Sequence, residues 1–192
     1  MSKETAIDWI DEHQKRIIEI SDRIWDLPEL GLQELRSSTL LADELERGGF
    51  KVQRGVAEMP TAFVATYGRG RPVIGIMGEY DALAGLSQKP VPRREPIIPG
   101  ASGHGCGHNI HGTSGAAAAL AVRRVMEAQK LKGTLKFYGC PAEETLVGKV
   151  WLVRDGYFKD VDAVLSHHPG TSNTAGLSSS NAMNSVKFHF YG

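Results

Sequence analysis

The sequence predicts an α/β/α sandwich, in which helices cover both faces of a largely parallel central sheet. Short apolar segments alternate along the chain with longer segments whose apolar residues recur at helical spacing. One short segment, Val73–Gly78, is apolar at nearly every position, which is typical of a strand buried on both faces of a parallel sheet. With 192 residues, 41% of them apolar and 23% charged, the chain has the composition of one globular domain.

The first elements are predicted to be two helices followed by two short strands. Isoleucines between Ile7 and Ile24 recur at near-helical spacing, and Pro28 ends that helix. A second helix is predicted over Ser37–Arg47, where two glycines follow it. Strand-like segments come next at Phe50–Val56 and Phe63–Tyr67.

The remaining elements follow the predicted central strand. A segment rich in proline and glycine, Gly85–Gly103, is expected to be an irregular loop. A helix over Thr113–Lys130, a strand over Thr134–Tyr138 and a helix over Glu144–Arg154 follow. The last predicted element is a buried strand over Val161–Ser166.

Composition argues against several classes of partner. Lysine plus arginine and aspartate plus glutamate both total 22, so the chain has no net charge to attract nucleic acid or an anionic membrane. The apolar run Ala116–Val122 is too short to span a bilayer, and Met1–Trp9 is polar where a signal peptide would be apolar. We therefore expect a cytoplasmic protein, in which Cys106 and Cys140 do not form a disulfide.

Polar residues follow three of the predicted strands. Glu79 and Asp81 come after one, Cys140–Glu144 after another, and His167 and His168 after a third. Ligands of such sheets bind beyond the carboxyl ends of the strands, so we expect these side chains to converge.

The segment Gly103–Gly112 contains four potential metal ligands within eight residues: His104, Cys106, His108 and His111. The simpler interpretation is a glycine-rich turn whose histidines are solvated. The short spacing of the cysteine and the second histidine, directly before a predicted helix, favours a metal site.

Adjacent carboxylates at Glu143 and Glu144 form a second motif. Two desolvated carboxylates repel one another unless a cation lies beside them, whereas two solvated ones would form an ordinary acidic turn. Neighbouring carboxylates can also divide their roles, one as a metal ligand and one as a proton acceptor. The pair His167 and His168 is weak evidence on its own and gains weight from its place at a strand end.

These motifs occur in the same order and spacing in the amidohydrolase branch of the aminoacylase and carboxypeptidase metallohydrolase family, and the chain resembles most the aminobenzoyl-glutamate hydrolase type. The likeness covers nearly the whole chain and implies a zinc-peptidase-like fold. The matching segments are Pro28–Gly31 with Glu34, Gly78–Leu83, Gly103–Asn109, Pro141–Glu144 and Asp162–Pro169.

The resemblance implies a role for each matching residue. Cys106, His108, Glu144 and His168 would be ligands of two divalent metal ions, manganese or zinc, and Glu143 the general base. Asp81 stands where the family keeps an orienting aspartate, and Glu79 where other branches have a ligand histidine. Four further residues are expected beside the ligands or the substrate: His104, Asn109, His111 and His167.

The implied reaction is hydrolysis of the amide bond of an N-acyl or N-aroyl amino acid, an aminobenzoyl-glutamate-like compound or a small peptide, by a metal-activated water. Two alternatives remain open. Cys106 could be a thiol nucleophile with His108 or His111 as its base. The chain could also be a metal-binding or interaction fragment without activity.

Members of the family are considerably longer than this chain. The resemblance therefore implies that residues 1–184 are the N-terminal part of a catalytic domain. Residues 185–192 would begin a dimerisation and lid domain, after which a final histidine ligand follows. We expect the fold to be incomplete and the chain to be inactive alone and to self-associate, whereas the full-length protein would be a homodimer.

Overall fold

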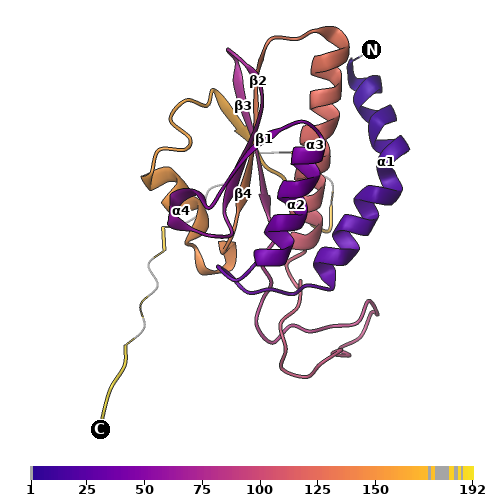
Figure 1. Cartoon of the computed structure of the whole chain (residues 1–192). Coiled ribbons are helices and arrows are strands. Elements are labelled where there is room, and N and C mark those ends of the chain that lie inside the picture. The colour runs from indigo at the N-terminus through magenta and orange to yellow at the C-terminus, as the bar shows by residue number, and fades with distance from the viewer. Residues whose placement is uncertain (1, 173, 176–181, 184–185, 187) are drawn as a thin grey trace.

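The computed structural model describes residues 2–172, 174–175, 182–183, 186 and 188–192 (Figure 1). The helices are α1 (Ser2–Trp25), α2 (Leu35–Arg47), α3 (His108–Gln129) and α4 (Gly148–Arg154), with 3₁₀ turns at Val56–Glu58 and Glu143–Thr145. The strands are β1 (Lys51–Arg54), β2 (Phe63–Arg69), β3 (Val73–Glu79), β4 (Gly133–Cys140) and β5 (Ala163–Leu165). None of the described helices is long and apolar enough to cross a membrane.

The strands form one sheet in the order β1-β2-β4-β3-β5. β3 runs parallel to β4 on one side and to β5 on the other, so that Ile76 lies opposite both Phe137 and Leu165. β2 and β1 continue the sheet with antiparallel pairing. The three parallel strands therefore point their carboxyl ends to the same edge of the sheet.

Helices cover both faces of the sheet, which confirms the predicted α/β/α class. On one face α2 and α3 pack against the strands, and α1 lies along α3 (Figure 1). This layer holds the larger core, which includes Leu41, Phe63 and Phe137. On the other face α4 covers a smaller core that includes Met59 and Leu152.

Glycines allow α3 to lie unusually close to β3. A Cβ atom at Gly112 would be 2.5 Å from the carbonyl oxygen of Glu79, and one at Gly78 would be 3.1 Å from Cα of Gly112. The lack of side chains at these two positions brings the first turn of α3 against the carboxyl end of β3.

Two helices differ from their predicted bounds. α3 begins at His108, ahead of the predicted Thr113, because Gly107 adopts a left-handed conformation with φ of 78° and starts the helix there. The predicted helix over Glu144–Arg154 is divided, because Ala142 and Leu146 also have left-handed backbone angles and enclose a separate 3₁₀ turn.

The last predicted strands differ more. The prediction that Val161–Ser166 is buried is wrong: β5 is shorter and exposed, and the Leu165 side chain is 60% exposed. Within the described residues β5 lies at the end of the sheet and pairs with β3 alone. Within 185–192, where the resemblance implies the start of the next domain, positions 185 and 187 lie outside the described residues, and the other positions have no regular secondary structure. The domain boundary at 184 stays a prediction.

Candidate metal centre

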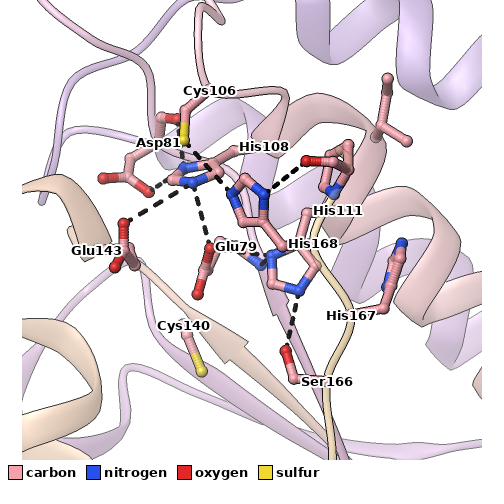
Figure 2. Close-up of polar contacts among 12 residues, drawn as sticks. Glu79, Asp81, Cys106, His108, His111, Cys140, Glu143, Ser166, His167 and His168 are labelled. Atoms are coloured by element: carbon pink, nitrogen blue, oxygen red, sulfur yellow. Dashed lines mark hydrogen bonds and ion pairs between the residues drawn. The ribbon is translucent and has the colours of Figure 1, made fainter. Parts of the chain in front are cut away.

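His108, at the start of α3, lies in the middle of the residues that the strand ends bring together (Figure 2). Its side chain is fully buried. Its Nε2 lies 3.2 Å from Glu79 Oε2, 3.8 Å from Glu143 Oε2 and 3.9 Å from Glu144 Oε1. One imidazole nitrogen therefore faces three carboxylates.

Asp81 fixes the orientation of the His108 ring. The Nδ1 of His108 is 3.0 Å from Asp81 Oδ1, and Asp81 Oδ2 accepts a hydrogen bond from the backbone N–H of Glu144 at 3.0 Å. With Nδ1–H donating to Asp81, the lone pair of Nε2 is directed at the carboxylates. Burial alone would lower the pKa of His108, but the hydrogen bond to Asp81 and the nearby carboxylates raise it.

Cys106 and His168 complete the cluster on the side of the glycine-rich loop. His168 Nε2 lies 3.4 Å from Cys106 Sγ. The ligand atoms of Cys106, His108 and His168 lie within 4.8 Å of one another, and those of Glu79, His108 and Glu143 do so as well. His108 belongs to both groups, and its Nε2 could bind one ion.

The donor atoms fit the divalent ions that the sequence implies. Among the described residues, His108 Nε2 and Glu144 Oε1 are buried atoms without a hydrogen-bond partner. Such an atom costs about 1–3 kcal/mol when nothing satisfies it, so a cation between the two would relieve both. Thiol and imidazole ligands suit zinc, and the carboxylates also accept manganese.

The two cysteines lie in different surroundings, and both are free thiols. Cys140 is fully buried in the core under α4, and burial raises its pKa to about 12. Burial, followed by the contact with Glu144, raises the pKa of Cys106 to about 11. A thiol with so high a pKa is protonated at neutral pH and is then a poor nucleophile. A metal ion that binds the sulfur displaces this proton.

Lys149, which sequence reasoning missed, brings a cationic group to the site. Its Nζ lies 2.5 Å from Glu79 Oε1, while Glu79 Oε2 is 3.0 Å from His111 Nδ1. Burial raises the pKa of Glu79, but His111 and Lys149 outweigh this effect and hold it at about 2. The only signal in the sequence was the place of this lysine shortly after the acidic motif.

Glu34 is a second residue that the predicted site did not include. It is fully buried, and its Oε1 accepts a hydrogen bond from the backbone N–H of Ala142 at 2.8 Å. Burial raises its pKa. Glu34 thus holds the left-handed residue that precedes Glu143, and its place in the early Pro-Glu-Leu-Gly pattern was the available signal.

Three of the predicted neighbours of the site face elsewhere. His104 is buried against a backbone carbonyl just after α1. Asn109 donates to Ser21 Oγ at 3.1 Å and joins α3 to α1. His167 Nε2 lies 3.0 Å from Ser114 Oγ, on the far side of its segment from the cluster (Figure 2).

The chain is similar in sequence to known proteins. Residues 75–183 match the sequence profile of peptidase family M20/M25/M40. The chain is 49% identical to a p-aminobenzoyl-glutamate hydrolase of Escherichia coli over 84% of its length, and covers 34% of that protein. It is 33% identical to the Xaa-Arg dipeptidase of Homo sapiens over 95% of its length, and covers 42% of that protein.

The fold also matches solved structures. The YXEP protein of Bacillus subtilis, described as a dinuclear metal binding peptidase, superimposes with a TM-score of 0.71 and 26% identity over 83% of this chain and 44% of its own. The chain spans between a third and about two fifths of the length of the two curated relatives named above. From the profile match and these identities, the chain belongs to peptidase family M20/M25/M40.

Proposed function

We propose that this chain forms the metal-holding part of a two-metal amidohydrolase. The observation that carries the proposal is the convergence of a thiol, two imidazoles and three carboxylates, with the buried Nε2 of His108 between them and unsatisfied among the described residues. The names of the relatives, an aminobenzoyl-glutamate hydrolase and a dipeptidase, support substrates in which an amide bond joins an acyl or aminoacyl group to an amino acid. N-acyl and N-aroyl amino acids and small peptides are therefore the proposed substrates.

Four residues would hold the ions: Cys106, His108, Glu144 and His168. Once bound, the ions would polarise the amide carbonyl and lower the pKa of a water molecule. Asp81 keeps the His108 ring turned toward them, and the backbone N–H that Glu144 donates to Asp81 fixes the acidic turn.

Glu143 is the better placed of the two adjacent carboxylates to move a proton. Its side chain is 32% exposed, whereas that of Glu144 is 21% exposed and has one buried oxygen. A carboxylate that solvent and substrate can reach can accept the proton of the attacking water and return it to the departing amine. Glu144 has the deeper position, which suits a ligand.

Calorimetric titration of the 192-residue chain with Zn²⁺ and Mn²⁺ tests the ligand set. Replacing Cys106 or His168 by alanine should weaken metal binding by roughly ten-fold or more. Losing a residue that only hydrogen-bonds to a metal ligand already lowers affinity by about that factor, and losing a ligand should cost at least as much. His167→Ala is a matched control, because this neighbouring histidine faces Ser114 and should leave the affinity unchanged. Unchanged affinity in the Cys106 variant would overturn the assignment.

Activity is to be tested in a longer relative, because we also propose that this chain does not hydrolyse such substrates by itself. A chelator should abolish turnover of an N-aroyl amino acid, and manganese or zinc should restore it. Activity that survives the chelator and is lost on alkylation of the cysteine would instead support the thiol mechanism. In the described geometry the imidazole 3.4 Å from that thiol is His168, not His108 or His111 as the thiol mechanism supposed.

A further inference from the structure

A continuous line of polar contacts runs beside the metal-holding cluster. Lys149 Nζ in α4 is 2.5 Å from Glu79 Oε1 at the end of β3, and Glu79 Oε2 is 3.0 Å from His111 Nδ1 in α3. His111 Nε2 is in turn 3.2 Å from Ser166 Oγ, just after β5 (Figure 2). We name these four residues the polar brace.

Two members of the polar brace are of residue types that bind metals. Glu79 Oε2 lies 3.2 Å from His108 Nε2, so position alone would allow Glu79 to share an ion with His108. However, each oxygen of Glu79 already has a partner, Lys149 or His111. Both nitrogens of His111 are engaged as well. His111 could bind an ion only by breaking a contact of the brace, and Glu79 could bind one only through an oxygen that it shares with Lys149 or His111.

Within the polar brace, the charge of Lys149 determines whether Glu79 is available to bind an ion. Glu79 is 5% exposed, and a buried carboxylate without a counter-ion would turn to whatever cation is nearest. Lys149 reaches it because α4 starts directly against the end of β4. A Cβ atom at Gly148 would lie 1.8 Å from the carbonyl oxygen of Pro141, so a larger residue there would push the helix away.

We propose that Lys149 is a positioning residue, which acts through the polar brace to keep Glu79 and His111 out of the ligand set of the metal centre. The inference rests on the proposed function, because it takes the ions to lie beside His108. The brace leaves Cys106, His108, Glu144 and His168 as the ligands. It also ties down Ser166, which lies two positions before His168 in the chain.

The test compares Lys149→Met, Lys149→Arg, Glu79→Gln and the double variant Lys149→Met with Glu79→Gln, each titrated with Mn²⁺ and Zn²⁺. Lys149→Met should free Glu79 to bind and so tighten Mn²⁺ binding on the order of ten-fold, the scale of effects from groups around metal ligands. Lys149→Arg keeps the ion pair and should behave like the wild type. The double variant removes both charges and should also return to the wild-type affinity.

A lysine needed only for folding would lower the melting temperature without tightening metal binding, so the sign of the effect separates the two roles. Unchanged or weaker binding in Lys149→Met would overturn the inference, and so would tighter binding that persists in the double variant. Should Lys149→Met fail to fold, Glu79→Gln decides with its Co²⁺ absorption spectrum. An altered spectrum would make Glu79 a ligand and contradict the proposal, whereas an unaltered spectrum supports it.

The Cys106→Ala variant distinguishes this failure from failure of the proposed function. If metal binding does not depend on Cys106, the proposed centre itself is wrong. If binding depends on Cys106 but Lys149→Met does not tighten it, the centre stands and only the role of the polar brace is rejected.

Discussion

Two buried carboxylates beside His108, those of Glu79 and Asp81, are each held by different partners. Glu79 pairs with Lys149, and Asp81 accepts from the His108 ring and from the backbone of Glu144. The partners come from separate helices and strand ends. These partners compensate the charges of Glu79 and Asp81, so the two carboxylates can lie close together in the protein interior beside a bound cation.

The adjacent glutamates provide the sharpest test at the scale of residues. In a longer relative, changing the counterpart of Glu143 to glutamine should abolish turnover while both ions stay bound, because an amide cannot accept the proton. Changing the counterpart of Glu144 should release metal. Turnover rates together with metal content by emission spectroscopy would show this division of roles, and similar behaviour of the two variants would refute it.

Sequence reasoning found the residues of the cluster because cysteine, histidine and paired glutamates stand at strand ends in recognisable motifs. It missed Lys149 and Glu34, because a single lysine or glutamate is usually solvated. Their burial depends on approaches between segments far apart in the chain, such as the 2.8 Å contact of Glu34 with the backbone of Ala142. Periodicity along the sequence does not contain that information.

At the scale of elements, the errors in the predicted bounds fall beside the site. The predicted helix begins only at Thr113, because glycines and polar residues interrupt the helical pattern between His108 and Gly112, which form the start of α3. In the structure the left-handed Gly107 starts the helix, and Gly112 allows its contact with β3. The residue pattern that usually marks a helix is therefore interrupted at the positions beside the metal ligands.

Gly112 provides a prediction about this helix. Alanine stabilises most helix interiors by about 1 kcal/mol relative to glycine. At Gly112 the added Cβ would lie 2.5 Å from the carbonyl oxygen of Glu79, so we expect Gly112→Ala to destabilise the chain by about 1–3 kcal/mol instead. Urea denaturation measures the change. Ser114→Ala, a half-buried site on the same helix, is the control, and a stabilised Gly112 variant would contradict the packing described.

The contact between α1 and α2 predicts a pH dependence away from the metal centre. Burial alone would raise the pKa of Glu44, but hydrogen bonds from Arg16 and Arg47 lower it below its usual 4.5. A lowered acid pKa stabilises the fold above the unfolded pKa, and this contribution is lost as the pH falls through the folded value. Glu44→Gln should thus cost about 1 kcal/mol at pH 7 and nothing once Glu44 is protonated. Unfolding free energies from pH 7 to 3 provide the measurement, and a difference that does not change with pH would contradict it.

The whole molecule has one well-covered face and one that is thinly covered. α1, α2 and α3 lie on one side of the sheet, whereas α4 is the described helix on the other side, and the sheet ends at the exposed strand β5. Val150, Val153 and Leu165 are each at least 60% exposed on these two elements. The apolar residues of the last strand led to the prediction that it is buried. That prediction is wrong, because a sequence shows which segments are apolar but not which other segments pack against them.

Self-association is the prediction at this scale, since β5 ends the described sheet and presents backbone groups that another strand can pair with. We expect the chain to form dimers or larger species as its concentration rises, measured by sedimentation velocity. Leu165→Lys should shift the equilibrium toward monomer at little cost in stability, because the side chain is 60% exposed and a charge at a sheet edge opposes pairing. Ile18→Lys, at a 56% exposed position on α1, is the matched control and should leave association unchanged. A chain that stays monomeric at every concentration, or equal effects of the two lysines, would show that the β5 edge is not the surface through which copies meet.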